Sequence, residues 1–266
     1  MAEKNRRIPL SGPLRDVGKF LLLIGLIVWF LARGTEQLGY HWQWYRVPRY
    51  VFSIDEGRLI LGPLMTGLKI TFEITGISLL LASVFGIATA LCRLSGSFMA
   101  RLLARGYLEI IRNTPLLVQL FFIYFVLGPV IGLSRFSSAV LALSLFEGAY
   151  ASEIFRAGIV SIHRGQWEAA HSLGLSLPDT YIHIILPQAI RQILPSLTGQ
   201  AISLIKDSAL VSTIAIYDLT MRGQEIIAET FLTFEIWFTV AAIYLMITVV
   251  LSVAVNLMEN HLRVDT

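Results

Sequence analysis

The residues best placed to do chemistry lie in a polar segment, about 160–187, between long apolar runs. Glu168 is followed directly by Ala169 and Ala170, and Gly174 comes four residues later. Small side chains let another surface approach the backbone closely, and the Glu168 carboxylate could pair with a basic residue on that surface. The pattern predicts either a docking loop for a partner or a helix that caps the chain's own bundle.

Two short helices are expected to position these residues. The stretch Arg164–Leu173 has a helical pattern, and Gly174 follows it as a C-terminal glycine does. Ser176 and Asp179 have the spacing of a capping box, which predicts a second short helix that ends at Pro187. The sequence therefore predicts two short helices joined at a corner. They would lie at the cytoplasmic face of the membrane that the long apolar runs predict.

A second polar group interrupts an apolar run farther along the chain. Lys206, Asp207 and Ser208 follow the uncharged stretch Gln192–Ile205. Charges inside a membrane are expensive and usually functional, so this group is a candidate for a substrate pathway. The alternative is a structural ion pair that only orients helices.

Other polar residues in apolar surroundings allow the same two interpretations. Thr114 and Gln119 could line a pathway or serve as hydrogen bonds between packed helices. Glu147 and Glu153 allow the same two interpretations, because their position along a helix does not show which face of the helix meets water.

Signatures of catalytic and metal sites are missing from the sequence. A P-loop needs Gly-x-x-x-x-Gly-Lys followed by Ser or Thr, but the one Gly-Lys pair, Gly18-Lys19, precedes Phe20. The histidines form no HExxH motif, and no Gly-x-Ser-x-Gly turn is present. We expect neither an enzyme nor a bound metal or cofactor in this chain, so that any energy must come from another subunit.

Composition indicates a membrane protein. Of the 266 residues, 55% are hydrophobic and only 15% are charged, whereas soluble domains carry about 25% charged residues. Cys92 is the one cysteine, which excludes a disulfide scaffold. The net charge of +3 is too small for a nucleic-acid-binding surface.

Apolar runs predict an all-α integral membrane fold of about six transmembrane helices, because about 20 residues span the hydrocarbon of a bilayer. The predicted spans are Phe20–Ala32, Ile74–Cys92, Asn113–Ser134, Phe136–Phe155, Gln192–Ile205 and Ile236–Met258. Most lysines and arginines then lie on one side, which the positive-inside rule makes the cytoplasm, with both termini inside.

The region before the second span carries two further alternatives. Phe20–Ala32 could be a signal peptide, although Arg33 within the candidate cleavage pattern argues for a retained helix. The stretch Gly34–Arg58 is rich in aromatic residues and predicts an interfacial belt on an outer loop, or a surface that docks an external partner.

The segment around Glu168 resembles the EAA loop of ABC-importer permeases. The match consists of Glu168-Ala169-Ala170, Gly174 and Ile184-x-Leu186-Pro187 at the family spacing. Further stretches, beginning at Tyr107, Gly148, Leu186 and Leu204, are similar to the polar amino-acid uptake branch (histidine, glutamine and glutamate permeases), and the resemblance covers Leu61–Glu259.

This resemblance implies a permease domain over residues 61–266, with a five-helix core. Residues 1–60 would add an N-terminal cytoplasmic tail, an extra transmembrane helix and the aromatic outer loop. The segment at about 160–187 would be the coupling helix that docks on an ATP-binding subunit. Its implied contact residues are Glu168, Ala169, Ala170, Leu173, Gly174 and Leu175.

The resemblance also implies partners and a cargo. The partners would be two ATP-binding subunits that hold ATP and Mg²⁺, a second permease subunit (identical or a sibling) and an extracytoplasmic solute-binding protein. The cargo would be a polar amino acid carried across the bacterial cytoplasmic membrane. Net positive charge and Lys206 would suit an acidic one. The rival interpretation is a secondary transporter or channel driven by an ion gradient, which has no need of the loop Gln166–Pro187.

Overall fold

The computed structural model describes residues 11–37, 39–55 and 58–262 and divides into two units after Trp44. The first unit consists mainly of α1 (Ser11–Gln37), whose apolar stretch is Val17–Phe30. The Arg33 guanidinium lies 5.1 Å from the ring centre of Trp29, a cation–π contact typical of a membrane interface. The predicted first hydrophobic segment is therefore a helix.

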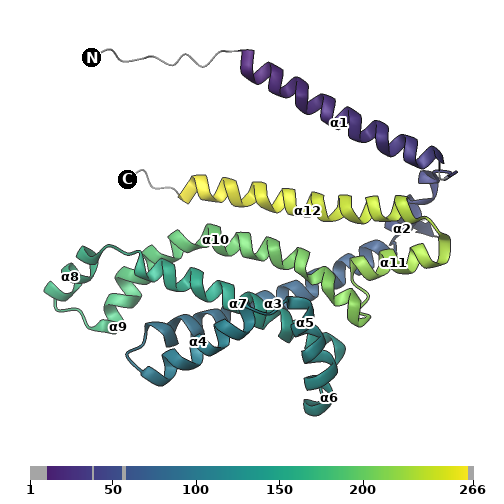
Figure 1. Cartoon of the computed structure of the whole chain (residues 1–266). Coiled ribbons are helices and arrows are strands. Elements are labelled where there is room, and N and C mark those ends of the chain that lie inside the picture. Colours follow the sequence, from purple (N-terminus) through teal and green to yellow (C-terminus); the bar gives the residue numbers. More distant parts are fainter. Residues whose placement is uncertain (1–10, 38, 56–57, 263–266) are drawn as a thin grey trace. The chain divides into compact units, whose positions relative to one another are not determined.

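The second unit contains three helices long and apolar enough to cross a membrane (Figure 1). They are α3 (Pro63–Leu94), α7 (Arg135–Val160) and α12 (Thr233–Leu262). These helices contain the predicted spans Ile74–Cys92, Phe136–Phe155 and Ile236–Met258, respectively. The predicted span near Gln192 is the helix α10 (Leu186–Asp207), which is amphipathic rather than uniformly apolar.

The predicted span Asn113–Ser134 is not a separate straight helix. It forms the second arm of a bent pair whose first arm is α4 (Phe98–Arg112), and the bend between the arms is 106°. The second arm consists of α5 (Leu116–Phe121), the π-helical turn η2 (Phe122–Leu127) and α6 (Gly128–Ile131). Pro115 causes the break, since it has no N–H group and disfavours helical backbone in the residue before it.

Helices α3 and α7 meet along a seam of small residues, here called the α3–α7 seam. Ser78, Ala82 and Gly86 contribute from α3, and Ser144 and Gly148 from α7, all nearly or fully buried. The Ser144 hydroxyl is shared between the Val140 carbonyl of its own helix at 2.5 Å and the Ser78 carbonyl of α3 at 3.3 Å. A Cβ on Gly148 would lie 2.9 Å from an α3 side chain. Small residues allow this approach between membrane helices.

Shorter elements close the end of the bundle opposite to α8 (Figure 1). They are η1 (Trp44–Arg46), α2 (Pro48–Val51), the antiparallel strands β1 (Phe52–Asp55) and β2 (Arg58–Leu61), η4 (Ser208–Ile214) and α11 (Leu219–Thr230). Leu64, Leu219, Ile236 and neighbouring apolar residues join α3, α11 and α12 in a buried cluster.

The expectation that Pro187 ends a short helix is wrong. Helix α9 (Leu177–Asp179) continues through the π-helical turn η3 (Thr180–Ile185) into α10. The Leu186 N–H donates to the Tyr181 carbonyl five residues back. This wider turn places Pro187 in the first turn of α10, where a proline is tolerated.

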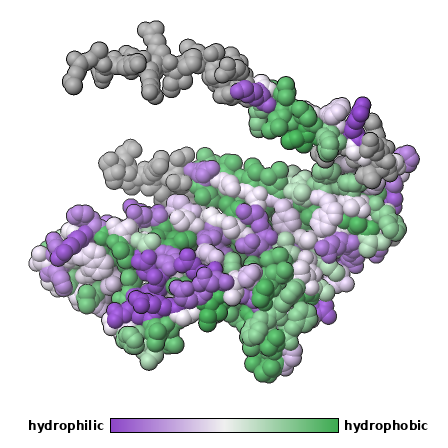
Figure 2. Space-filling view, viewed as in Figure 1, coloured by the Kyte–Doolittle hydropathy of each residue, from purple (hydrophilic) through white to green (hydrophobic). Residues whose placement is uncertain are grey.

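Hydropathy divides the surface of the second unit (Figure 2). Hydrophobic side chains cover α12 and the α5–α6 arm, whereas hydrophilic ones gather over α4 and the end that carries α8. Exposed apolar residues of α12 include Leu245, Met246, Val249 and Val253. This distribution matches a bundle whose apolar helices face lipid and whose α8 end lies outside the hydrocarbon.

Gly67 tests how closely α11 packs on α3. A Cβ at this position would lie 2.7 Å from the backbone carbonyl of Asp218, so α11 would have to move. We expect Gly67→Ala to lower the free energy of unfolding by about 1–3 kcal/mol, measured as a lower unfolding temperature in detergent. Gly76→Ala on the same helix meets nothing within 4 Å and should be neutral or stabilising. Equal unfolding temperatures for the two variants would contradict this packing.

Candidate functional site

Helix α8 (Arg164–Ser172) is closed at both ends by local hydrogen bonds. The His163 ring nitrogen accepts from the Gly165 N–H at 3.0 Å. Gly174 has φ +71°, and the Leu175 N–H donates to the Ala170 carbonyl at 3.1 Å. This is the Schellman ending of a helix, in which the left-handed residue is usually glycine. The predicted helix and its C-terminal glycine are confirmed.

The inner face of α8 packs against the chain itself. Ala170 is 2% exposed, and the Trp167 and Tyr181 rings meet edge to face at 5.1 Å. Both rings pack on a cluster that includes Ile159 of α7 and Ile185 of η3. A displacement of α8 would therefore be transmitted directly to the ends of α7 and α10.

The outer face of α8 carries an exposed ion pair, and an exposed leucine follows at its C-terminal end. The Glu168 side chain is 65% exposed and accepts from Arg164 Nε at 2.9 Å, an ordinary surface pair. Leu173 is 78% exposed, and Ala169 and Gly174 are also on the surface. Leu175 is half-buried. Five of the six predicted contact residues thus remain accessible. Ala170 faces inward, because adjacent residues of a helix point about 100° apart.

Glu153 is the centre of an ion cluster that the sequence pattern could not reveal. Its carboxylate lies 2.5 Å from Arg93 of α3, 3.2 Å from Arg112 at the end of α4, and 3.2 Å from Arg156 of α7. The four residues come from three helices that only the fold brings together. The cluster ties these helices beside a polar cavity of about 340 Å³ that Arg105 and Asn113 also line.

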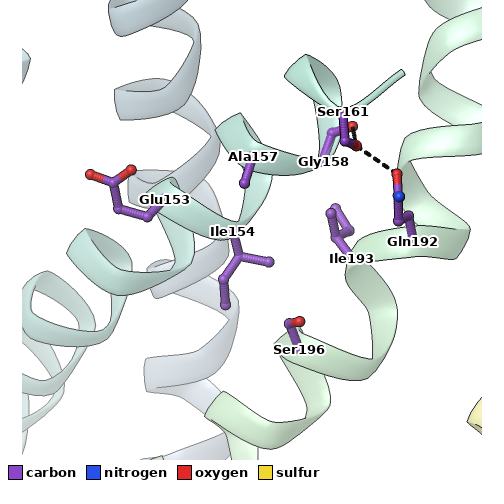
Figure 3. Close-up of a pocket in the computed structure, with 8 residues that line it drawn as sticks. All are labelled: Glu153, Ile154, Ala157, Gly158, Ser161, Gln192, Ile193 and Ser196. Atoms are coloured by element: carbon purple, nitrogen blue, oxygen red, sulfur yellow. Dashed lines mark hydrogen bonds between the residues drawn. The ribbon is translucent and has the colours of Figure 1, made fainter. Parts of the chain in front are cut away.

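A second cavity, of about 440 Å³, is lined by α7 and α10 close to the base of α8 (Figure 3). Ile154 and Gly158 line one wall, and Ile193 lines the other. The Ser161 hydroxyl bridges the two helices by donating to Gln192 Oε1 at 2.6 Å. One turn before this bridge the two helices are in close contact, because a Cβ on Gly158 would overlap the Ile193 side chain.

Thr114 and Gln119 hold the bend between α4 and α5. The Thr114 hydroxyl donates to the Ile110 carbonyl at 2.8 Å. The Gln119 amide nitrogen donates to the carbonyls of Ile111 at 2.7 Å and Thr114 at 3.0 Å. These bonds pair backbone groups that the break at Pro115 leaves without helical partners. In this structure the Thr114 hydroxyl and the Gln119 amide group therefore donate to backbone carbonyls.

Lys206, Asp207 and Ser208 lie where α10 gives way to η4. Ser208 is fully buried, and its hydroxyl donates to the Ile205 carbonyl at 2.7 Å. Lys206 is exposed and Asp207 is half-buried. Asp207 lies close enough to Glu147 of α7 for their charges to interact. The fold thus brings together two acidic residues that are 60 positions apart in the sequence.

Within the described residues no three His, Cys, Asp or Glu side chains are grouped as a metal site would require. The geometry instead offers a rigidly seated outward helix at one end of the bundle. It also offers charged groups between the long helices.

Comparisons with known proteins agree with one another. Residues 82–264 match the family described as the inner membrane component of binding-protein-dependent transport systems. The chain is 40% identical over 204 residues to the glutamine transport system permease of Escherichia coli (strain K12), covering 76% of this chain and 93% of that protein. It is also 40% identical to the L-cystine transport system permease of Bacillus subtilis (strain 168), covering 74% and 85%. A crystal structure of an amino acid ABC transporter with histidines superposes with a TM-score of 0.70 at 36% identity, over 75% of this chain and 94% of that one.

Gln119→Leu tests the hydrogen bonds at the bend. The change leaves the carbonyls of Ile111 and Thr114 without this donor in a buried position, which should cost about 1–3 kcal/mol of folding free energy. We expect a lower unfolding temperature in detergent. Gln188→Leu is the control, because the exposed Gln188 amide makes the same kind of bond to the Ile184 carbonyl at 2.8 Å. A larger loss for Gln188→Leu would refute the role of Gln119.

Proposed function

The chain belongs to the family of inner membrane components of binding-protein-dependent transport systems, and we propose that α8 is the helix through which it is driven. It is a multi-pass permease subunit of an ABC importer for polar amino acids, and its family works with ATP-binding subunits and a binding protein. The rival interpretation, an ion-gradient-driven carrier or channel, is not favoured, since the relatives are ABC permeases.

The coupling role is supported by the position of α8, which packs against the chain on one face and is exposed on the other. Its inner face is fixed to α7, η3 and α10 through Trp167 and Ala170. Its outer face offers Leu173 as an apolar projection beside small residues and the Glu168 carboxylate. A partner that binds the outer face would therefore move the ends of both helices together, because they pack on one another and on Trp167.

The ATP chemistry belongs to the partner in this proposal. ATP and Mg²⁺ are held by ATP-binding subunits, and this chain contributes motion rather than ligands. Two such subunits, a second permease subunit and an external solute-binding protein complete the transporter. Closure of the ATP-binding subunits then exposes the pathway alternately to the two sides of the membrane.

The orientation of the chain in the membrane is inferred from the distribution of its arginines. Arg93, Arg112, Arg156 and Arg164 all lie toward the end of the bundle that carries α8. Positive residues are retained on the cytoplasmic side of bacterial membranes, so α8 faces the cytoplasm and both termini are inside.

The substrate pathway in this proposal runs between α5, α7 and α10. Thr114 and Gln119 shape its wall by fixing the bend. Ser208 fixes the turn after α10, while Lys206 and Asp207 supply charge at the same level. Support comes from the general cost of charges in a membrane, which makes an intramembrane Asp or Lys a functional candidate.

Glu168→Lys tests the coupling surface. Reversing this exposed charge places like charges together if the partner offers a basic residue, which costs about 3 kcal/mol or about a hundredfold in affinity. We expect the ATP-binding subunit to copurify poorly and substrate-stimulated ATPase activity to fall, with normal insertion of the permease.

Glu229→Lys is the matched control, because Glu229 is an exposed glutamate on α11, remote from α8. It should leave copurification and ATPase activity unchanged. Full transport by Glu168→Lys, or an equal loss in Glu229→Lys, would overturn the assignment of α8.

Cysteine labelling tests the orientation. In a background with Cys92 replaced by serine, Gln166→Cys on α8 should react with a membrane-impermeant maleimide only after the cytoplasmic face is opened. Trp44→Cys should react from outside in intact cells. The reverse pattern would show that the inferred orientation is inverted.

A further inference from the structure

The polar cavity of about 340 Å³ beside Glu153 lies between α3, α4 and α7. Seven of the eight described residues that line it are polar or charged. Its charged lining residues are Arg93, Arg105, Glu109, Arg112 and Glu153, and Arg156 reaches the same Glu153 carboxylate from α7. Four arginines thus meet two glutamates, which leaves a net charge of +2 around the cavity. This charge suits an anionic ligand.

The arginines of this cavity keep most of their hydrogen-bond donors for another partner. Arg93 and Arg112 each donate to Glu153 through one nitrogen, at 2.5 and 3.2 Å, although a guanidinium has five N–H groups. Arg105 is exposed and makes no hydrogen bond or ion pair with another described residue. Glu109 instead accepts from the Asn113 amide at 2.9 Å. The cavity therefore presents N–H donors of the kind that bind a phosphate group in pairs.

Helix α4 places apolar side chains beside these arginines. Arg101, Arg105 and Arg112 share one face of the helix, because residues four and seven positions apart lie within about 40° of one another. Phe98 and Leu102 flank this face and are exposed. Basic residues next to exposed apolar ones on a helix are typical of a segment that lies at a membrane surface.

The level of the cavity corresponds to the headgroup boundary of a bilayer. Helix α7 has 26 residues, or about 39 Å at 1.5 Å per residue, which is close to the full bilayer thickness. Glu153 lies seven residues before its end at Val160, so the cavity is about 10 Å from that end. In the proposed orientation this end is cytoplasmic, and basic pockets between membrane helices on that side bind anionic headgroups.

We propose that this cavity binds the headgroup phosphate of an anionic phospholipid from the cytoplasmic leaflet, and that Arg105 selects it over a zwitterionic lipid. The proposal goes beyond the transport function and uses only the orientation from it. The phosphate accepts paired N–H donors from Arg105 and Arg112, while the acyl chains follow the apolar side chains of α4. A zwitterionic headgroup binds less well, because its ammonium group meets the net positive charge of the site.

The test uses the purified, delipidated permease in complex with its ATP-binding subunit in detergent. Dioleoyl phosphatidylglycerol and dioleoyl phosphatidylcholine are added in equal amounts, and the bound lipids are counted by native mass spectrometry. We expect phosphatidylglycerol to bind at least about tenfold more tightly, because each arginine near the surface contributes about fivefold to the binding of anionic lipid. Phosphatidylglycerol should also raise the unfolding temperature, since a ligand that binds the folded state stabilises it.

Arg105→Gln removes a charge that has no ion pair within the described part of the chain, so the cluster around Glu153 stays intact. We expect the preference for phosphatidylglycerol to fall about fivefold, with an unchanged unfolding temperature in phosphatidylcholine. Arg105→Lys keeps the charge and should keep most of the preference. Arg191→Gln is the matched control, because Arg191 is an exposed arginine on α10, and it should leave the preference unchanged.

Equal binding of the two lipids to the unchanged complex would overturn the proposal, as would equal losses of preference in Arg105→Gln and Arg191→Gln. A further arm adds inorganic phosphate. Displacement of phosphatidylglycerol by an equal concentration of inorganic phosphate would show that the site takes a soluble anion and that the lipid assignment is wrong. Lipid binding in detergent does not depend on which side of the membrane α8 faces, so its failure is distinguishable from failure of the labelling test.

Discussion

The close approach of α3 and α7 sets the position of the charged groups that lie between the long helices. Lipid tails are as apolar as the helices, so the hydrophobic effect does not drive membrane helices to associate. Packing and interhelical hydrogen bonds must therefore hold them together. The α3–α7 seam provides both, through Ser78, Ala82 and Gly86 against Ser144 and Gly148. Once this pair is fixed, Arg93 reaches Glu153, and Glu147 faces the space left between the pair and α10.

Two glutamates on α7 show how the fold assigns different roles to one residue type. Glu153 is surrounded by Arg93, Arg112 and Arg156, and its charge is satisfied within the chain. Glu147, less than two turns away, is more deeply buried and has an acceptor without a donor. Breaking a buried pair leaves a costly charge, so Glu153 is suited to holding the three helices together.

Departures from regular α-helix gather where motion would be needed. The π-helical turn η2 lies within the second arm of the bent pair, η3 directly precedes α10, and the 3₁₀ turn η4 follows Asp207. Such turns leave backbone hydrogen bonds rearranged and often mark functional hinges. Because α8 is seated directly on η3 through Trp167 and Tyr181, a pull on α8 acts on one of these irregular turns first.

Local signals in the sequence determined the elements that depend only on near neighbours. The apolar runs specify α3, α7 and α12, and Gly174 specifies the end of α8, because hydrophobic length and a left-handed glycine act within a few residues. The motif at Glu168 likewise identified the family, which the comparisons confirm.

Tertiary structure decided whatever depends on partners distant in the chain. It placed Ala170 inward and carried the helix past Pro187 by a π turn. It also separated Glu147 from Glu153, which look alike in the sequence. The reason is physical: the free energy of a buried charge is set by groups that approach through space, here three arginines around Glu153 and a mostly apolar wall beside Glu147.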